Sequence, residues 1–301
     1  MRRRMARAPD SGLMTRADAM LIADRIACGT RVPELPEVET TRRGILGPLS
    51  GRRITEVVLR RPDLRWPIPG EIGPGLTGEV VLDVRRRAKY LLIDVARGSA
   101  LIHLGMSGCL RVLPAATAVG AHDHVDFVLD DGKALRFTDP RRFGCLLWQP
   151  QGITHPLLAG LGPEPLGDAF DGDYLFARSR GLRAGVKTFL MDQSVVVGVG
   201  NIYAAESLHR AGIAPTRAAG RVSRARYGQL ADAVREILAH AIQRGGTTLR
   251  DFLSPDGAPG YFEQELLVYG RAGEACRRCG GVLRSAQLGQ RATVWCPRCQ
   301  R

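Results

Sequence analysis

Four cysteines near the end of the chain have the residue type and spacing of a metal site. Cys276 and Cys279 form one Cys-x-x-Cys pair, Cys296 and Cys299 form a second, and sixteen residues separate the two pairs. This spacing is typical of four-cysteine zinc sites, and four thiolates fill the tetrahedral coordination of zinc without leaving an open position. We therefore predict one structural zinc ion. The alternating residues between the pairs predict a β-hairpin, so that residues 271–301 form a small zinc finger.

A second candidate for chemistry is the segment 33–40, with the sequence Pro-Glu-Leu-Pro-Glu-Val-Glu-Thr. Proline in the first turn and carboxylates near it are typical of a helix start, because the carboxylates lie at the positive end of the helix dipole. Only three of the 43 basic residues are lysines, namely Lys89, Lys133 and Lys187. A lysine, unlike an arginine, can lose its proton or act as a compact point charge. Lys89 and Lys187 are therefore candidate functional residues, whereas Lys133 lies in an Asp-Gly turn.

The charge of the chain favours a polyanionic partner. The formal net charge is +13, and the first 32 residues, with seven arginines and three aspartates, account for only +4 of it. Strong positive charge in such a chain is typical of nucleic-acid binding. The first 32 residues contain no apolar run suited to a signal peptide or a membrane span, and the cysteines do not form a secreted disulfide framework. We expect a monomer that contacts no membrane and works in the reducing cytoplasm.

The order of the expected elements predicts an α+β fold. Runs rich in Val, Ile and Leu predict strands in the first half, with Asp131-Gly132 marking a hairpin. Burying them requires two packed sheets or a flattened barrel. The runs cover residues 53–60, 80–95, 100–113, 124–130 and 133–148.

After a Pro- and Gly-rich linker the pattern becomes helical. Apolar residues from Leu230 to Ile242 repeat with helical spacing and end at Gly245-Gly246. A shorter helix is predicted over Asn201–Arg210, with Asn201 as its N-terminal cap.

Several motifs, in order along the chain, resemble the formamidopyrimidine-DNA glycosylases, bacterial enzymes that excise oxidised purines. The resemblance runs from Pro33 to the last residue and implies an N-terminal catalytic β-sandwich domain (33–150), a linker (151–172), a helix-two-turn-helix domain (173–270) and the zinc-finger hairpin (271–301). The motifs are the segment that begins at Pro33, Arg-Arg-Ala-Lys-Tyr-Leu-Leu at 86–92, Leu-Gly-Met-Ser-Gly at 104–108, Asp-Pro-Arg-Arg-Phe-Gly at 139–144, Val-Gly-Val-Gly-Asn-Ile-Tyr-Ala at 197–204, and the finger.

The resemblance implies a catalytic set. Pro33 would be the nucleophile, through a free secondary amine that forms a Schiff base with the sugar and leads to β,δ-elimination of the strand. Glu34 would be the general acid that protonates the sugar ring oxygen, which requires a carboxyl held protonated or nearly so. Lys89 would contact phosphate and donate a proton around β-elimination, and Arg291 would grip a phosphate and assist δ-elimination. Glu37 is interpreted as an orienting residue.

The resemblance also implies contacts with double-stranded DNA that contains oxidised bases or abasic sites. A glycosylase takes its target base out of the stack, and other groups fill the gap. Met106, Arg141 and Phe143 would fill it, and a loop between Gly245 and Gln264 would close over the flipped base. The remaining candidates for contacts with the DNA backbone are His122, Arg183, Asn201 and Lys187, the last of which faces the backbone or the lesion pocket.

Residues 1–32 conflict with this chemistry, because a proline inside a chain has an amide nitrogen and no useful nucleophilicity. Val32 precedes Pro33, and GTG encodes valine but also starts translation in bacteria. We therefore hypothesise that the extension, which the family lacks, reflects a misassigned start or is removed by a protease. Two alternatives stay open. One is an endonuclease VIII-type glycosylase for oxidised pyrimidines, which typically opens Pro-Glu-Gly-Pro; the other is a catalytically dead DNA-binding module that retains the extension.

Overall fold

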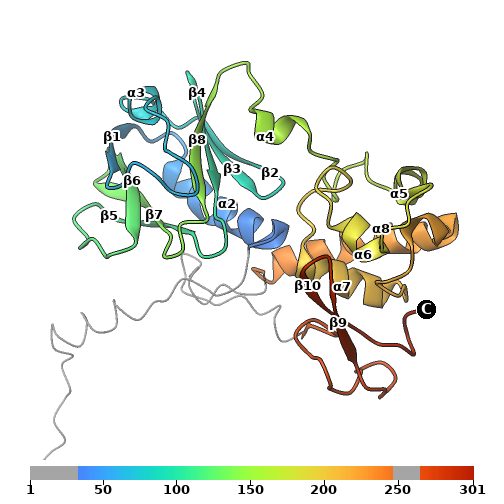
Figure 1. The fold of residues 1–301 in the computed structure, drawn as a ribbon. Coiled ribbons are helices and arrows are strands. Elements are labelled where there is room, and N and C mark those ends of the chain that lie inside the picture. Colours follow the sequence, from blue (N-terminus) through green and yellow to red (C-terminus); the bar gives the residue numbers. More distant parts are fainter. Residues whose placement is uncertain (1–32, 247–264) are drawn as a thin grey trace, which may run out of the picture.

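The computed structural model describes residues 33–246 and 265–301. In Figure 1 the strands of the first half lie on one side, the helices of the second half on the other, and a terminal hairpin packs beneath the helices. The predicted extension (1–32) and most of the loop predicted to close over the flipped base lie outside the described residues. No helix in the described ranges is long and apolar enough to cross a membrane.

Two four-stranded antiparallel sheets form the first half, which confirms the predicted β-sandwich and the α+β class. Their inner faces share one apolar core, to which Ile93 and Leu146 contribute from one sheet and Phe127 and Leu135 from the other. One sheet has the order β2 (Asp83–Arg87), β3 (Tyr90–Val95), β4 (Gly98–His103) and β8 (Cys145–Pro150); the other has β1 (Ile54–Leu59), β6 (Asp123–Leu129), β7 (Lys133–Thr138) and β5 (Cys109–Pro114). A short helix, α3 (Ile72–Leu76), contacts β1 and β4.

Three of the runs predicted as strands each contain two strands. The run 80–95 turns at Ala88, which adopts a left-handed backbone conformation with φ of 55°. The Ala88 N–H donates to Glu164 Oε1 over 2.8 Å, so a residue far along the chain holds the turn in place. The turn carries no Gly, Asn or Asp at that position, which explains why residue preferences did not reveal it.

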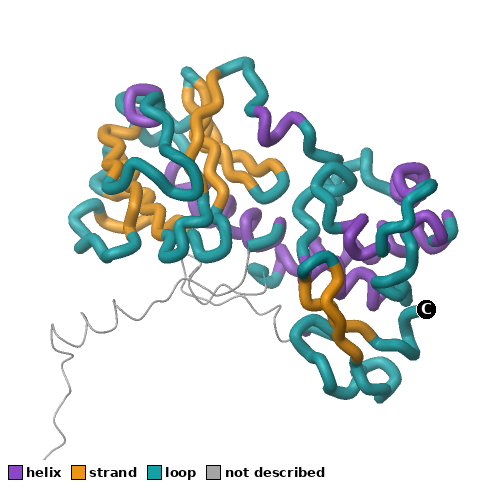
Figure 2. The backbone as a smooth tube through the Cα atoms, in the orientation of Figure 1, coloured by secondary structure: helices purple, strands orange, loops and turns teal. Residues whose placement is uncertain are grey.

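Four helices form most of the second half, visible in purple in Figure 2: α5 (Gly172–Ser179), α6 (Val186–Leu190), α7 (Asn201–Arg210) and α8 (Arg224–Gln243). The periodic apolar residues predicted for the long helix lie on the buried face of α8. A 3-10 turn, η1 (Ala219–Arg221), precedes α8. The predicted hairpin is confirmed as β9 (Arg284–Leu288) and β10 (Arg291–Trp295).

Helix α2 (Leu35–Leu49) joins the two halves, because it packs against β2 at one side and α8 at the other (Figure 1). The segment 151–172, predicted as a linker, contains the helix α4 (Pro156–Ala159). It is also tied to the sandwich, since Arg87 forms an ion pair of 3.0 Å with Glu164. The two halves are therefore connected by fixed contacts as well as by the chain.

Candidate active site and zinc centre

A cleft of about 950 Å³ lies between the sandwich, the helical half and the finger. It brings together residues from distant motifs, because Lys89, Met106, Arg141 and Phe143 line it from the sandwich and Arg291 lines it from the finger. The other lining residues include Arg65, Tyr90, His103, Gly105, Met191, Gln193, Val199 and Gly200.

The Glu34 carboxylate is buried beside this cleft, with 3% of the residue exposed. It accepts hydrogen bonds from the backbone N–H groups of Gly200 at 2.8 Å, Ile202 at 2.9 Å and Tyr203 at 3.4 Å. Glu34 thus satisfies the first amides of α7, and the prediction that Asn201 caps this helix is wrong. Gly200 is the cap position and must lack a side chain, because a Cβ there would lie 2.3 Å from Glu34 Cδ.

Glu34 and Lys89 influence each other's protonation. Burial raises the pKa of Glu34, although Lys89 and the backbone amides of α7 oppose this rise. Burial likewise lowers the pKa of Lys89, against the attraction of Glu34 and Glu37. Each group is thus shifted toward its neutral form, which is the state that a general acid of the carboxyl type requires before it donates a proton.

Pro33 lies two residues before α2, next to the cap residue Glu34, and is half-buried. The first turn that follows it is fixed, because the Glu34 N–H donates to Glu37 Oε2 over 2.9 Å and Tyr203 Oη donates to Glu37 Oε1 over 2.7 Å. The Leu35 N–H donates to the Gly198 carbonyl over 3.1 Å. Glu37 therefore orients the start of α2 against the helical half, as the sequence predicts.

The two loops that carry Met106, Arg141 and Phe143 are held together by the fully buried Asp139. Asp139 accepts from Ser107 Oγ at 2.6 Å and from the Gly144 N–H at 2.8 Å. The Arg141 guanidinium lies 5.0 Å from the centre of the Phe143 ring, and both side chains are exposed, whereas Met106 is half-buried. These three groups line the cleft on two loops that Asp139 joins by hydrogen bonds.

Three of the four remaining predicted DNA contacts lie in different environments. His122 is exposed beside Asp139, whose N–H donates to the His122 carbonyl, while His124 is buried. Arg183 is exposed between α5 and α6 and does not line the cleft. Asn201 is the first residue of α7, and its Nδ2 donates to the Ala292 carbonyl over 3.1 Å.

Lys187 is buried, with 1% of the residue exposed. Its Nζ donates to Asn201 Oδ1 at 2.6 Å, Thr293 Oγ1 at 2.7 Å and the Ala292 carbonyl at 3.3 Å. Burial, supported by Arg291, lowers the pKa of Lys187 to about 8. In this structure the ammonium group joins the helical half to the finger instead of facing outward, and contact with DNA at this position stays a prediction.

His103 lines the cleft but was not identified from the sequence. Its Nδ1 accepts from the Gly105 N–H over 2.9 Å, and its ring centre lies 4.9 Å from that of Tyr90. Burial and the nearby charges of Lys89 and Arg65 lower the pKa of His103 to about 4, so the ring is neutral near pH 7. A histidine at the end of an apolar strand, directly before a Gly-rich loop, was the available signal.

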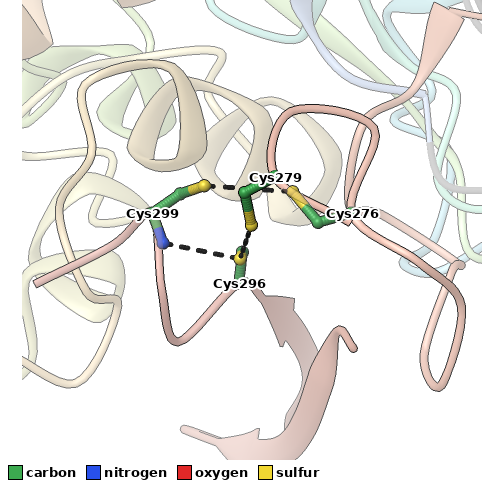
Figure 3. Close-up of side chains that lie close together, drawn as sticks. All are labelled: Cys276, Cys279, Cys296 and Cys299. Atoms are coloured by element: carbon green, nitrogen blue, oxygen red, sulfur yellow. Dashed lines mark hydrogen bonds between the residues drawn. The ribbon is translucent and has the colours of Figure 1, made fainter. Parts of the chain in front are cut away.

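The four cysteine sulfurs form a cluster in which all Sγ atoms lie within 4.8 Å of one another (Figure 3). Two pairs are separated by 3.5 Å (Cys279 and Cys296) and 4.0 Å (Cys276 and Cys299). Tetrahedral zinc with sulfur ligands at about 2.3 Å gives sulfur–sulfur distances of about 3.8 Å. Burial and the neighbouring thiols raise the pKa of Cys299 to about 12, so a nearby cation is needed to hold the Cys299 side chain as a thiolate. The cluster therefore fits one structural zinc ion.

Three family models match the chain. They are the "Formamidopyrimidine-DNA glycosylase N-terminal domain" over residues 32–146, the "Formamidopyrimidine-DNA glycosylase H2TH domain" over 161–253 and the "Zinc finger found in FPG and IleRS" over 273–301.

Relatives and solved structures agree with these matches. The formamidopyrimidine-DNA glycosylase of Stenotrophomonas maltophilia K279a is 71% identical over 270 residues, which are 90% of this chain and all of that one. That of Xanthomonas euvesicatoria pv. vesicatoria is 72% identical over 271 residues, with the same coverage. The MutM (Fpg) crystal structure from Thermus thermophilus has a TM-score of 0.79 at 39% identity and covers 89% of this chain and 98% of that one. The complex of Lactococcus lactis Fpg with abasic-site DNA has a TM-score of 0.82 at 31% identity, with coverage of 89% and 99%. This chain is therefore a member of the formamidopyrimidine-DNA glycosylase family.

Proposed function

We propose that this chain is a bifunctional repair enzyme that excises 8-oxoguanine and formamidopyrimidines from duplex DNA and then cleaves the strand at the abasic site. The observation that carries the proposal is the cleft that Lys89 and Arg291 line together, beside the buried Glu34. Solved relatives bind DNA with an abasic site or with the lesion Fapy-dG, which supports the same substrate class here.

In the proposed reaction the amine of Pro33 attacks the deoxyribose C1′, and the bond from C1′ to the damaged base breaks. Glu34 donates its proton to the sugar ring oxygen as the ring opens, and its raised pKa suits that role. The resulting iminium withdraws electrons and acidifies C2′, so that loss of a C2′ proton breaks the C3′–O bond. Lys89 supplies a proton and a phosphate contact at this stage, and Arg291 holds the phosphate for the second elimination.

Two sets of DNA contacts are proposed around this chemistry, one at the cleft and one outside its lining. Met106, Arg141 and Phe143 fill the gap left by the flipped base, since they line the cleft together. His122, Arg183, Lys187 and Asn201 are the proposed contacts with the DNA backbone. The enzyme acts as a monomer in a reducing cytoplasm, where the four zinc-binding thiols stay reduced.

Pro33 can act only with a free amine, so the proposal requires a form of the protein that lacks residues 1–32. The test begins with intact-mass analysis of the protein expressed from its own gene, for which the expected terminus is Pro33. Borohydride added during reaction with an 8-oxoguanine duplex should then trap a covalent adduct through Pro33.

A matched protein with an uncleavable tag ahead of Pro33 serves as the control and should not be trapped. Trapping of that blocked protein at an undiminished rate would exclude Pro33 as the nucleophile. A stable terminus at Met1 together with absent lyase activity would instead establish the catalytically dead DNA-binding module. The endonuclease VIII alternative is not favoured, because relatives that this chain covers in full are named formamidopyrimidine-DNA glycosylases.

A further inference from the structure

His209 is a buried histidine outside the cleft, with 2% of the residue exposed. It lies in the last turn of α7, and its Nε2 is 3.6 Å from Sγ of Cys276, one of the four zinc-binding cysteines. Its other ring nitrogen, Nδ1, is buried and has no hydrogen-bond partner among the described residues. A polar ring is thus fixed with one nitrogen toward the metal site.

The surroundings decide which nitrogen carries the proton. A proton on Nδ1 would leave a buried N–H group without an acceptor, which is rare and costs about 1–3 kcal/mol. It would also point the Nε2 lone pair at the lone pairs of the sulfur. A proton on Nε2 removes both conflicts, because the N–H group then points at the cysteine sulfur.

The spacing along α7 places His209 in a row of residues that contact the finger. Asn201, Ala205 and His209 follow one another at intervals of four residues, so they lie on one face of the helix. Asn201 donates to the Ala292 carbonyl over 3.1 Å, and Ala205 packs in the small apolar cluster that includes Cys276 and Val294. This face of α7 therefore contacts the finger, and His209 lies at the metal end of the face.

We propose that His209 donates its Nε2 hydrogen to the zinc-bound thiolate of Cys276 and so couples the metal site to α7. Four thiolates around one zinc ion carry a net negative charge, and an N–H donor from outside the ligand set stabilises that charge and fixes the ligand. His209 is a positioning residue in this proposal, which rests on the zinc assignment and does not depend on the catalytic role of any residue.

The first test compares the zinc-loaded enzyme with His209→Phe and His209→Gln by the rate of zinc release to excess chelator. Phenylalanine keeps a ring but removes the donor, whereas the glutamine Nε2 can take the place of the imidazole Nε2. We expect His209→Phe to release zinc roughly tenfold faster or more, in line with the loss of an outer hydrogen bond to a metal ligand, and His209→Gln to stay near the parent. The control is His240→Phe, since His240 is exposed on α8, and it should not change the rate.

Equal release rates for His209→Phe and the parent, or for the Phe and Gln variants, would overturn the proposal. A second measurement needs no variant and covers the case in which His209→Phe fails to fold. Nitrogen-15 NMR of the parent enzyme should show His209 as the Nε2–H tautomer, and an Nδ1–H tautomer would overturn the proposal as well. Neither readout depends on base excision, so failure here leaves the proposed glycosylase activity intact.

Discussion

The sandwich and the zinc finger are both antiparallel β-structures, but different interactions hold them in shape. The sandwich encloses a large apolar core to which both sheets and α2 contribute. The finger has a small buried cluster, two of whose members, Cys276 and Cys296, are zinc-binding cysteines, and β9 is largely exposed. A segment this small buries too little apolar surface to fold alone. The sandwich is therefore stabilised by its own packing, and the finger by metal and by its neighbours.

Removing one zinc-binding thiol should give the largest effect and separate the two regions. Cys296→Ser should lose zinc, unfold the hairpin and displace Arg291, because apparent zinc-binding free energies of about 10–16 kcal/mol are also folding free energies in zinc-finger peptides. Lesion binding should weaken, while the sandwich stays folded. Bound zinc and thermal unfolding measure this, with Cys109→Ser as the control outside the metal site. Stoichiometric zinc and normal lesion binding in Cys296→Ser would refute the finger assignment.

The next variant weakens the sandwich and leaves the finger unchanged, by breaking a buried ion pair. Arg136 is 1% exposed and forms two hydrogen bonds of 2.8 Å with Asp126. Arg136→Met should lower the free energy of unfolding of the sandwich by about 3–5 kcal/mol, because the buried Asp126 loses its main partner. Zinc content should not change.

Denaturant unfolding measures this effect against Arg85→Met, which breaks the more exposed Arg85–Asp94 pair and should cost less than about 1 kcal/mol. Similar losses in the two variants would show that the buried pair has no special role in the sandwich.

Lys187→Met tests how the finger is attached to the helical half. The variant removes three hydrogen bonds of the ammonium group and leaves Asn201 and Thr293 without that donor. The free energy of unfolding should fall by about 1–3 kcal/mol as a result. Zinc should stay bound. Strand cleavage should fall, because Ala292 loses its hydrogen bond to Lys187 and the neighbouring Arg291 is then held less firmly in the cleft. Zinc stoichiometry and single-turnover cleavage measure this. Lys133→Met, at an exposed lysine, is the control, and unchanged cleavage in Lys187→Met would remove the attachment role.

The smallest change is expected from Arg291→Ala, which leaves both regions folded. Zinc binding and thermal stability should match the parent, since Arg291 is exposed. The salt dependence of DNA binding should lose about one counterion, and the δ-elimination product should decrease. Arg284→Ala, on the partner strand of the same hairpin, should retain that product. If Arg291→Ala keeps both the salt slope and the product pattern, Arg291 is only a solvated surface residue.

Most of the fold can be predicted from patterns among neighbouring residues. The features that the sequence does not predict depend on contacts between distant segments. The cysteine spacing, the α8 periodicity and the strand-rich half are properties of neighbouring residues, so the sequence predicts them directly. The Ala88 turn depends on Glu164, and the start of α7 depends on Glu34; no local pattern contains either partner. The rarity of lysine marks Lys187 as a candidate functional residue, but the burial of its side chain follows from the packing of β10 against it. Roles in the cleft came from the family motifs, because spacing alone does not bring residues 34, 89 and 291 together.

The capping of α7 by Glu34 gives one side chain both a proposed role in the chemistry and a part in the contact between the two halves of the enzyme. Its carboxylate accepts from amides 166 or more residues away, and a protonated carboxyl or an amide is a weaker acceptor than a carboxylate. Once Glu34 has donated its proton to the sugar, the resulting carboxylate would accept these hydrogen bonds more strongly. The sandwich would then be held more tightly against the helical half at the step in which Pro33 becomes covalently bonded to the DNA strand. A low rate of reaction in a Glu34→Gln variant would therefore have two causes, the missing acidic proton and a weaker contact between the two halves. Hydrogen exchange at the α7 amides would measure the second cause separately.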